Sequence, residues 1–485
     1  MSGLLPVANV LGGLMMLFSL SYVVPIAASL FWLDGVASDF ALGMAITMGG
    51  GLLLYLLTHR HRRELKVRDG FVLVTFSWLI MGAIAAVPLM LIYTELSFTS
   101  ALFETISAMT TTGATVLSGL DHAPQSVNLW RHLLQWLGGL GIIVLAVAIL
   151  PLLGVGGMQL YRAEMPGPMK ESRITARIAD TAKALYFVYA GSTLLCGVAL
   201  WVAGMSPFDA LCHAFSTVSL GGFSTRDANV AAYDSPAIEI VMVAFMFVGA
   251  INFATHFLAW RDKTVKPYQS DAEARAGILV IVASFLGVAV YLYMSGTYEA
   301  FGRALRHAFF NVASVGLGAG FSSVDYTAWP VLLPHFLLVL SCFCASSGST
   351  GSGLKMVRGL ILLKQGFREL HKLVHPHAAE QVKVGGLPVP NKVVFSVLAF
   401  FFVYLASIVG ITLLLLATGM DLNHALSAAM ACINNLGPGL GTIGPASSYA
   451  ALDDPQKWIC MFAMLLGRLE IMSVLVLFTR SFWRK

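Results

Sequence analysis

Long apolar stretches separated by short polar connections run through the whole chain. A helix that crosses a bilayer needs about 20 mainly apolar residues. Stretches of this kind lie near residues 5–31, 40–58, 71–93, 129–153, 184–204, 236–260, 276–295, 393–418 and 456–479, and a further one, at 328–364, is interrupted in its middle. The pattern predicts about ten crossings and an all-α polytopic membrane protein.

The composition excludes a water-soluble protein. Of the 485 residues, 57% are hydrophobic and 11% are charged, whereas a soluble chain has roughly a quarter charged residues. The mean hydropathy of +0.78 agrees with this. A soluble enzyme, a disulfide scaffold and a disordered protein are ruled out. Six cysteines lie in apolar or small-residue stretches without the spacing of a metal site or a secreted disulfide framework, so we expect packing thiols: Cys196, Cys212, Cys342, Cys344, Cys432 and Cys460.

The basic residues indicate how the spans are oriented. If residues 59–70 face the cytoplasm, the cytoplasmic segments hold 24 of the 30 Lys and Arg residues, and the positive-inside rule then places both termini in the cytoplasm. The outer side has 14 of the 25 acids, which either attract cations or are indifferent to topology. The cytoplasmic clusters are Arg60, Arg62, Arg63, Lys66, Arg68; Arg162, Lys170, Arg173, Arg177, Lys183; Arg261, Lys263, Lys266, Arg275; Lys355, Arg358, Lys364, Arg368, Lys372, Lys383, Lys392; and Arg480, Arg484, Lys485.

Four shorter segments between the long stretches resemble one another. They read ALFETISAMTTTG (101–113), ALCHAFSTVSLGG (210–222), AFFNVASVGLGAG (308–320) and ALSAAMACINNLG (425–437). About ten helical residues rise roughly 15 Å, half the hydrocarbon thickness, so each segment can enter the membrane, stop at mid-depth and return as extended chain. Interfacial or packing helices are the alternative. Each has a small residue six places after its first alanine and glycine at the twelfth: Ser107, Ser216, Ser314, Ala431; Gly113, Gly222, Gly320, Gly437.

The ends of these segments predict a cation filter. Extended backbone at mid-membrane must line a protein cavity, and its carbonyls suit a partly dehydrated cation. No acid lies there, so carbonyl number and spacing would select the ion, and K+ fits best. In the third segment Gly316 is an alternative to Gly320, but Ser314 and the GFSS continuation favour Gly320. The predicted filter residues are Thr111, Thr112, Gly113; Leu220, Gly221, Gly222; Gly318, Ala319, Gly320; and Asn435, Leu436, Gly437.

With these segments in place, the chain resembles the Trk/Ktr/HKT superfamily of K+ transporters, most closely the bacterial TrkH-type membrane subunit. The stretches TTTGATV, STVSLGGFST, GLGAGFSS and NNLGPGLGTIGP carry the resemblance. It implies that each repeat supplies one quarter of a filter, and that glycine at all four positions marks K+ selectivity, whereas serine in the first repeat marks Na+-preferring relatives. We therefore expect an N-terminal helix pair (1–68) and four pseudo-symmetric helix–pore-loop–helix repeats: 69–160, 178–262, 272–370 and 391–485.

The interrupted span predicts a gate. Ten consecutive small residues, 344–353, cannot hold a helix well at membrane depth, because glycine costs roughly 1 kcal/mol per site in a helix. A flexible loop below a filter is a natural gate, and the resemblance implies the same; a small-residue helix-packing patch is the alternative. Lys355 would tie the loop down or repel ions. The predicted gate residues are Gly348, Ser349, Thr350, Gly351, Ser352, Gly353, Lys355 and Arg468.

Arg468 lies within the last apolar stretch, where a charge costs about 2.5–3.5 kcal/mol. It should face the pore or pair with an acid or with carbonyls, unless it reaches the membrane surface. Glu470 is two residues on, on another helix face, and is not the expected partner. The resemblance implies that Arg468 lies beneath the filter beside the loop, and we expect it to be an electrostatic barrier and a latch for the gate.

The resulting hypothesis is a K+ uptake subunit of the bacterial inner membrane. The resemblance implies a homodimer on a cytosolic TrkA-like regulatory subunit that binds NAD(H) or ATP. K+ is the expected transported ion, membrane lipid surrounds the chain, and no nucleic-acid partner or nucleotide site of its own is expected. A proton- or Na+-coupled K+ symporter remains the alternative, although the repeats are parallel and Glu470 is the only clear mid-span acid. An intramembrane enzyme would need a catalytic set within the spans, and none is apparent.

Overall fold

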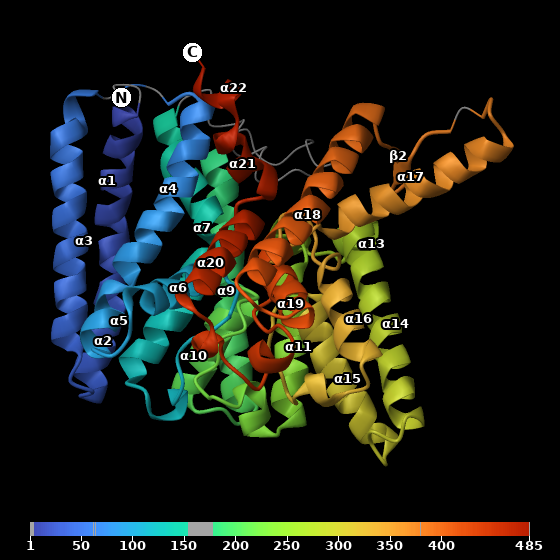
Figure 1. Ribbon diagram of the computed structural model, residues 1–485, viewed down its shortest axis with the longest axis horizontal. Coiled ribbons are helices and arrows are strands. Elements are labelled where there is room, and N and C mark those ends of the chain that lie inside the picture. The colour runs from blue at the N-terminus through green and yellow to red at the C-terminus, as the bar shows by residue number, and fades with distance from the viewer. Residues whose placement is uncertain (1–3, 62, 64, 154–177, 379, 485) are drawn as a thin grey trace.

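The structure is a computed structural model that describes residues 4–61, 63, 65–153, 178–378 and 380–484. The described chain is mostly α-helical with almost no strand, which confirms the predicted class. Within these residues the strands β1 (Lys383–Val384) and β2 (Leu387–Pro388) form one antiparallel hairpin, with Lys383 opposite Pro388. The described chain begins and ends at the same end of the molecule (Figure 1).

An N-terminal helix pair packs on one side of the other helices (Figure 1). Helices α1 (Leu5–Ser19) and α2 (Val23–Trp32) form one bilayer-length segment, and α3 (Ala37–Thr58) returns alongside. The pair is joined to the rest by polar contacts: the Tyr22 hydroxyl donates to the Ile84 carbonyl at 2.8 Å. These contacts fix the pair against the first of the four repeats.

The remaining chain forms four successive sets, each with a long helical segment, a short buried helix, an extended stretch of chain that we call the returning strand although it belongs to no sheet, and one to three further helices. The short α13 (Lys266–Ser270) connects the second and third sets. The sets are α4 (Val67–Ala85), α5 (Val87–Ile92), α6 (Phe98–Met109) and α7 (Gln125–Leu153); α9 (Ile178–Val202), α10 (Pro207–Val218), α11 (Pro236–Ala250) and α12 (Phe253–Asp262); α14 (Ala272–Met294), α15 (Phe301–Gly316), α16 (Leu332–Ser341) and α17 (Met356–Val374); and α18 (Asn391–Ala417), α19 (Leu422–Ile433), α20 (Asp454–Arg468), α21 (Ile471–Leu475) and α22 (Arg480–Trp483).

We call these sets repeats 1 to 4. The predicted boundaries 69–160, 178–262, 272–370 and 391–485 stay a proposal, and residues 154–160 of the first lie outside the described residues. The basic residues Arg62, Arg162, Lys170, Arg173, Arg177 and Lys485, used above to predict orientation, also lie outside them.

Two expected spans are broken. Within the described residues, six helices are long and apolar enough to cross a membrane, or up to eight if each bent helix pair counts as one span. The stretch 236–260 bends by 97° between α11 and α12, and the stretch 456–479 bends by 114° between α20 and α21. At the first bend Asn252 starts a new helix, because its side chain accepts a hydrogen bond from the Ala254 N–H. Hydropathy alone does not register such a cap.

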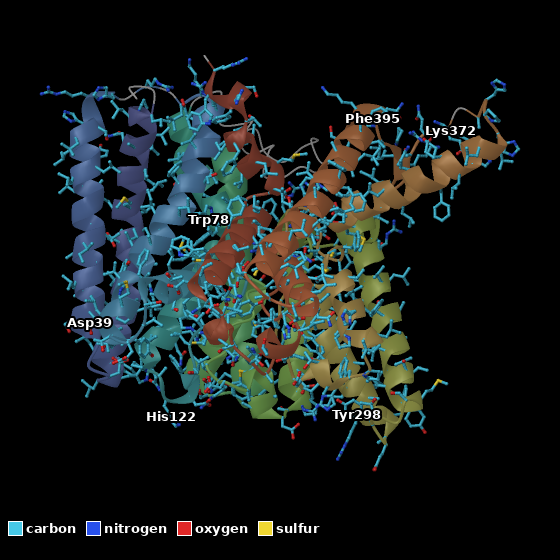
Figure 2. All side chains as sticks on the ribbon, in the orientation of Figure 1. Asp39, Trp78, His122, Tyr298, Lys372 and Phe395 are labelled. Carbon is cyan, nitrogen blue, oxygen red and sulfur yellow. The ribbon has the colours of Figure 1, made fainter. Side chains whose placement is uncertain are left out.

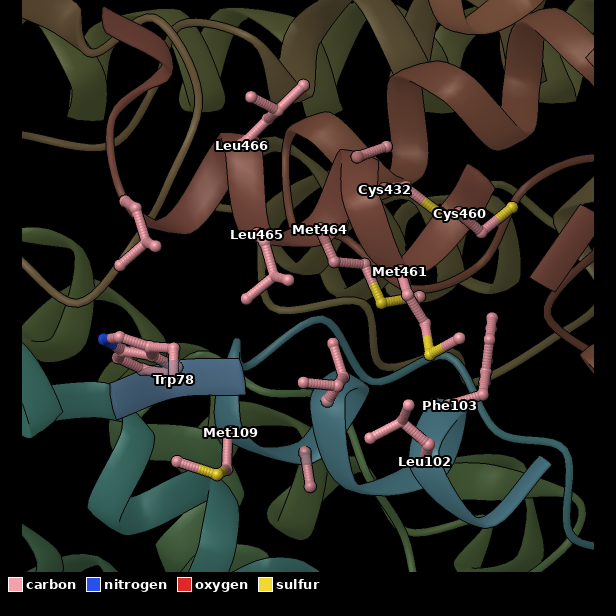
Figure 3. Close-up of a cluster of buried hydrophobic side chains, with 14 of the residues drawn as sticks. Trp78, Leu102, Phe103, Met109, Cys432, Cys460, Met461, Met464, Leu465 and Leu466 are labelled. Atoms are coloured by element: carbon pink, nitrogen blue, oxygen red, sulfur yellow. The ribbon is translucent and has the colours of Figure 1, made fainter. Parts of the chain in front are cut away.

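The four short helices lie inside the protein. A helix that ended in contact with lipid would leave backbone groups without hydrogen-bond partners, which is costly. Every residue of α6 from Thr99 to Met109 is buried. Figure 3 shows Met461 and Met464 of α20 directed toward Leu102 and Phe103 of α6. All six cysteines are free and buried, as expected for packing thiols.

Helix α17 leaves the other helices at the end of the molecule where the described chain begins and ends, and Lys372 lies on this arm (Figure 2). Asp39, His122 and Tyr298 lie toward the opposite end (Figure 2). The two ends differ in this way, but which one faces the cytoplasm stays a prediction.

Candidate functional site

The four short helices end in the same hydrogen-bonded turn. In each, the residue before the marked glycine donates its N–H to the carbonyl of the residue five places earlier. The residue immediately before that donor has a positive φ. This is the Schellman motif, which satisfies carbonyls at a helix end and reverses the chain. The bonds are Thr112 to Ser107 at 2.9 Å, and Gly221 to Ser216, Ala319 to Ser314 and Leu436 to Ala431 at 2.8 Å.

The left-handed residue of each turn differs in type. It is Thr111 (φ 54°), Leu220 (56°), Gly318 (80°) and Asn435 (51°). Only glycine adopts this conformation without strain, and a β-branched residue such as threonine is disfavoured there. In the third repeat Gly318 and Gly320 have positive φ at the positions equivalent to Asn435 and Gly437 of the fourth, whereas Gly316 is the last residue of α15.

The four marked glycines form a closed ring, which we call the glycine ring. All four have positive φ, from 77° at Gly222 and Gly320 to 93° at Gly437. A Cβ at any of them would lie closer than 3.0 Å to a backbone oxygen of the next repeat. The contacts run in order around the ring: Gly113 to Gly221, Gly222 to Ala319, Gly320 to Leu436, and Gly437 back to Thr112.

All twelve predicted filter residues are therefore brought together from four distant segments of the chain. Each is buried except Gly113, which is half-buried. A cavity of about 300 Å³ opens on one side of the ring, and all four glycines line it. Residues that follow the glycines, including Phe223 and Pro438, form its walls. We call this cavity the vestibule.

Side chains behind the ring hold its peptide groups. Gln135 Nε2 of α7 donates to the Gly221 carbonyl at 2.5 Å, and the Tyr449 hydroxyl donates to the Gly437 carbonyl at 2.8 Å. Each carbonyl oxygen has two lone pairs, so one such bond leaves a second acceptor position. The Asn435 amide donates to the Thr112 hydroxyl at 2.8 Å and so joins the fourth repeat to the first.

The interruption of repeat 3 is a loop, as predicted, and we call residues 342–355 the central loop. It docks on the bend of repeat 2. The Ser346 N–H donates to the Ala250 carbonyl at 2.9 Å, and Asn252 Nδ2 donates to the Ser347 carbonyl at 2.6 Å. The Thr350 hydroxyl donates to the carbonyl of Val218, the last residue of α10, at 3.0 Å.

The central loop and the vestibule lie on opposite sides of the ring. The loop contacts residues that precede the glycines, since a Cβ on Gly351 would lie 3.4 Å from both Leu220 and the Leu317 carbonyl. The vestibule is lined by the residues that follow them. The predicted gate residues Gly348 to Gly353 are all part of this loop, and Lys355 Nζ donates back to the Gly351 carbonyl.

The Arg468 guanidinium binds carbonyl oxygens, which is one of the arrangements expected from the sequence. Its guanidinium donates to the Thr350 carbonyl of the loop at 2.7 Å and to the Gly138 and Gly139 carbonyls of α7 at 2.6 and 2.9 Å. The charge therefore lies between the central loop and repeat 1, within the protein. Glu470, at the bend between α20 and α21, forms an ion pair with Arg358 of α17 at 2.8 Å.

Sequence reasoning missed one charged pair beside the ring. Glu104 of α6 and Arg131 of α7 form a fully buried ion pair at 2.7 Å. A signal was available in the sequence, because Glu104 is a charged residue inside an otherwise weakly polar repeat segment.

Comparison with known proteins gives consistent matches along the chain. Residues 37–485 match the family model TrkH, described as a cation transport protein. The chain is 46% identical over 480 residues to "Trk system potassium uptake protein TrkH" of Halomonas elongata and 41% identical over 482 residues to that of Escherichia coli, each covering 99% of both chains. It is similar to the crystal structure of the potassium transporter TrkH from Vibrio parahaemolyticus, with a TM-score of 0.89, 41% identity and 99% of both chains covered.

Proposed function

The chain belongs to the TrkH family of cation transport proteins, and from that premise we propose that K+ crosses the membrane through the glycine ring and that the central loop closes the pathway beneath it. The protein is a multi-pass bacterial membrane transporter that takes up K+. The observation that carries the assignment of the pathway is the closure of the ring, in which each glycine packs on the backbone of the next repeat.

The chemistry of the ring suits K+. Its twelve residues include no acid, so the ligands are peptide and hydroxyl oxygens. The C-terminal, negative ends of four helices point toward it, which favours a cation over an anion. Carbonyl coordination matches a large monovalent cation that gives up its water readily. The predicted filter residues, from Thr111 to Gly113 in repeat 1 to Asn435 to Gly437 in repeat 4, are accordingly the proposed K+ site.

The central loop and Arg468 form the proposed gate. The loop lies directly below the ring, and Arg468 binds its Thr350 carbonyl while also binding α7. A guanidinium at this depth repels a cation leaving the ring, and breaking its hydrogen bonds frees the loop. Gly348 to Gly353 and Lys355 would move when the gate opens.

The proposed assembly follows the family. We place both termini in the cytoplasm of a bacterial inner membrane, by the positive-inside rule. The relatives are named as parts of a Trk system, which supports a regulatory partner; we propose a TrkA-like subunit that binds NAD(H) or ATP, and a homodimer of this chain in the lipid bilayer. This chain contributes the K+ pathway and the partner contributes the nucleotide site.

The test is cation flux into liposomes that contain the purified chain. We expect uptake of K+ and Rb+ with little Na+, unaffected by an imposed proton gradient, and loss of K+ preference in Gly113→Ser. Accumulation that needs a proton or Na+ gradient would identify the coupled symporter instead. Wild-type flux with equal K+ and Na+ rates would refute the proposed filter.

A further inference from the structure

Three of the four short helices place a polar side chain at the same position, nine residues before the ring glycine. These residues are Glu104 in α6, His213 in α10 and Asn311 in α15. Each is fully buried. Each reaches across to the strand that leaves the ring, two or three residues after the glycine of its own repeat. None of them is needed to form the turn or to supply a ring carbonyl.

The contacts are alike in repeats 1 and 3. Glu104 Oε2 accepts the Val116 N–H at 2.9 Å, and Asn311 Oδ1 accepts the Ser323 N–H at 3.2 Å. Both N–H groups belong to the third residue after the ring glycine. In repeat 2, His213 Nε2 lies 3.0 Å from the hydroxyl of Ser224. The strand after the glycine is thereby attached to the helix before it.

Repeat 4 achieves the same attachment differently. Ala428 occupies the equivalent position, and the neighbouring Ser427 hydroxyl accepts the Leu440 N–H at 3.1 Å. The connection that follows is also joined to repeat 1, because the Tyr449 N–H donates to the Thr115 carbonyl at 2.8 Å. Every repeat therefore has a side chain that anchors its returning strand.

The anchor in repeat 1 is the only charged one of these four, and it extends into repeat 2. The side chains of Glu104 and Arg131 are 0% and 1% exposed. Arg131 also donates to the Thr115 hydroxyl at 3.2 Å, lies 3.5 Å from the Ser224 carbonyl, and stacks 4.2 Å from the centre of the Phe223 ring. The pair thus connects the residues that follow Gly113 with those that follow Gly222.

We propose that Glu104 and Arg131 are positioning residues that hold the ring at the size required to discriminate K+ from Na+. This inference rests on the proposed K+ pathway. A buried ion pair with its remaining hydrogen bonds satisfied is rigid, because any displacement exposes an unpaired charge to a medium of low dielectric constant. Carbonyl ligands select by their number and spacing, so loosening the strands beside two of the four glycines admits the smaller ion.

The test is the ratio of K+ to Na+ flux in liposomes for Glu104→Gln and Thr115→Val. Glu104→Gln keeps the shape but leaves the Arg131 charge unpaired, and Thr115→Val removes the hydroxyl shared by Glu104 and Arg131 at nearly constant volume. A charge-assisted hydrogen bond changes an equilibrium constant by roughly tenfold. We therefore expect the ratio of K+ to Na+ flux to fall by about that factor in Glu104→Gln and by less in Thr115→Val. K+ flux itself persists.

Thr412→Val is the matched control, because it removes a buried hydroxyl that donates to Ile408 within α18. It should leave the ratio unchanged. Gly113→Ser separates the two proposals: if it changes the ratio while folded Glu104→Gln and Thr115→Val do not, the positioning role is wrong and the filter stands. If the wild-type chain does not discriminate, the filter itself is wrong. Should Glu104→Gln fail to fold, Thr115→Val decides.

Discussion

Arg468 Nη1 lies 2.7 Å from the carbonyl oxygen of Thr350, although the two residues are 118 positions apart in the chain. The contact connects the end of α20 in repeat 4 with the central loop of repeat 3. The same guanidinium binds the backbone of α7 in repeat 1. One side chain thereby holds three repeats at the level below the glycine ring.

Arg468→Ala should open the pathway. It removes donors from the Thr350, Gly138 and Gly139 carbonyls, and hydrogen bonds to a charged group contribute about 1.5–3 kcal/mol each, so the open fraction should rise by roughly tenfold or more. K+ flux into liposomes without a regulatory subunit measures it. Arg468→Lys keeps the charge but not the two-pronged donor geometry and should give an intermediate flux. Unchanged flux in both variants would contradict the latch.

Gly320→Ala should abolish selective K+ flux. Its Cβ would lie closer than 3.0 Å to the Leu436 carbonyl, a backbone atom that cannot move without opening the ring. Gly318→Ala is the matched control two residues away. It also has a positive φ, but no atom lies within 4 Å of its Cβ, and the other repeats carry Thr111, Leu220 and Asn435 at this position. We expect Gly318→Ala to lose about 1–2 kcal/mol of stability and to retain its selectivity for K+. Loss of selectivity in both would show that strain, not the ring contact, decides.

Gly138→Ala should lower the thermal unfolding midpoint. A Cβ there would lie closer than 3.0 Å to the Met109 carbonyl at the end of α6, so α7 would be displaced from the short helix. Gly191→Ala in α9 has open space around its Cβ and should raise the midpoint slightly, because alanine is favoured over glycine in a helix by about 1 kcal/mol. Equal effects of the two substitutions in detergent-solubilised protein would argue against close packing at Gly138.

Glu470→Gln should destabilise the protein, because it leaves the Arg358 charge unpaired in the interior. Arg358 is 7% exposed at its side chain and lies 3.8 Å from the centre of the Phe400 ring. Breaking a buried ion pair costs about 3–5 kcal/mol, and the 18% exposure of Glu470 places this pair toward the lower value. Asp262→Asn breaks an exposed pair with Arg261 of similar length, 2.8 Å, and should leave the unfolding midpoint unchanged. Similar shifts for both variants would mean that burial does not strengthen the Arg358 pair.

The sequence predicted the helical class, the positions of the short helices and the four glycines, because each depends on local properties. A helix length is set by its apolar run, and a reversal of the chain at mid-depth needs residues that tolerate a positive φ. The same reasoning located the central loop, since ten small residues form a poor helix wherever they stand. For Arg468 the sequence offered the pore, an acid or carbonyls as alternatives, because a charge inside a protein needs partners, and only the structure showed that carbonyls bind it.

The contacts between repeats were decided only by the tertiary structure. The spans 236–260 and 456–479 were expected to be continuous, but Asn252 caps a new helix and binds the central loop, and Glu470 pairs with Arg358. Closure of the ring and the pairing of Glu104 with Arg131 likewise depend on which repeat lies beside which. Apolar periodicity records the burial of a residue but not its partner, since a partner distant in sequence leaves no trace in the local pattern.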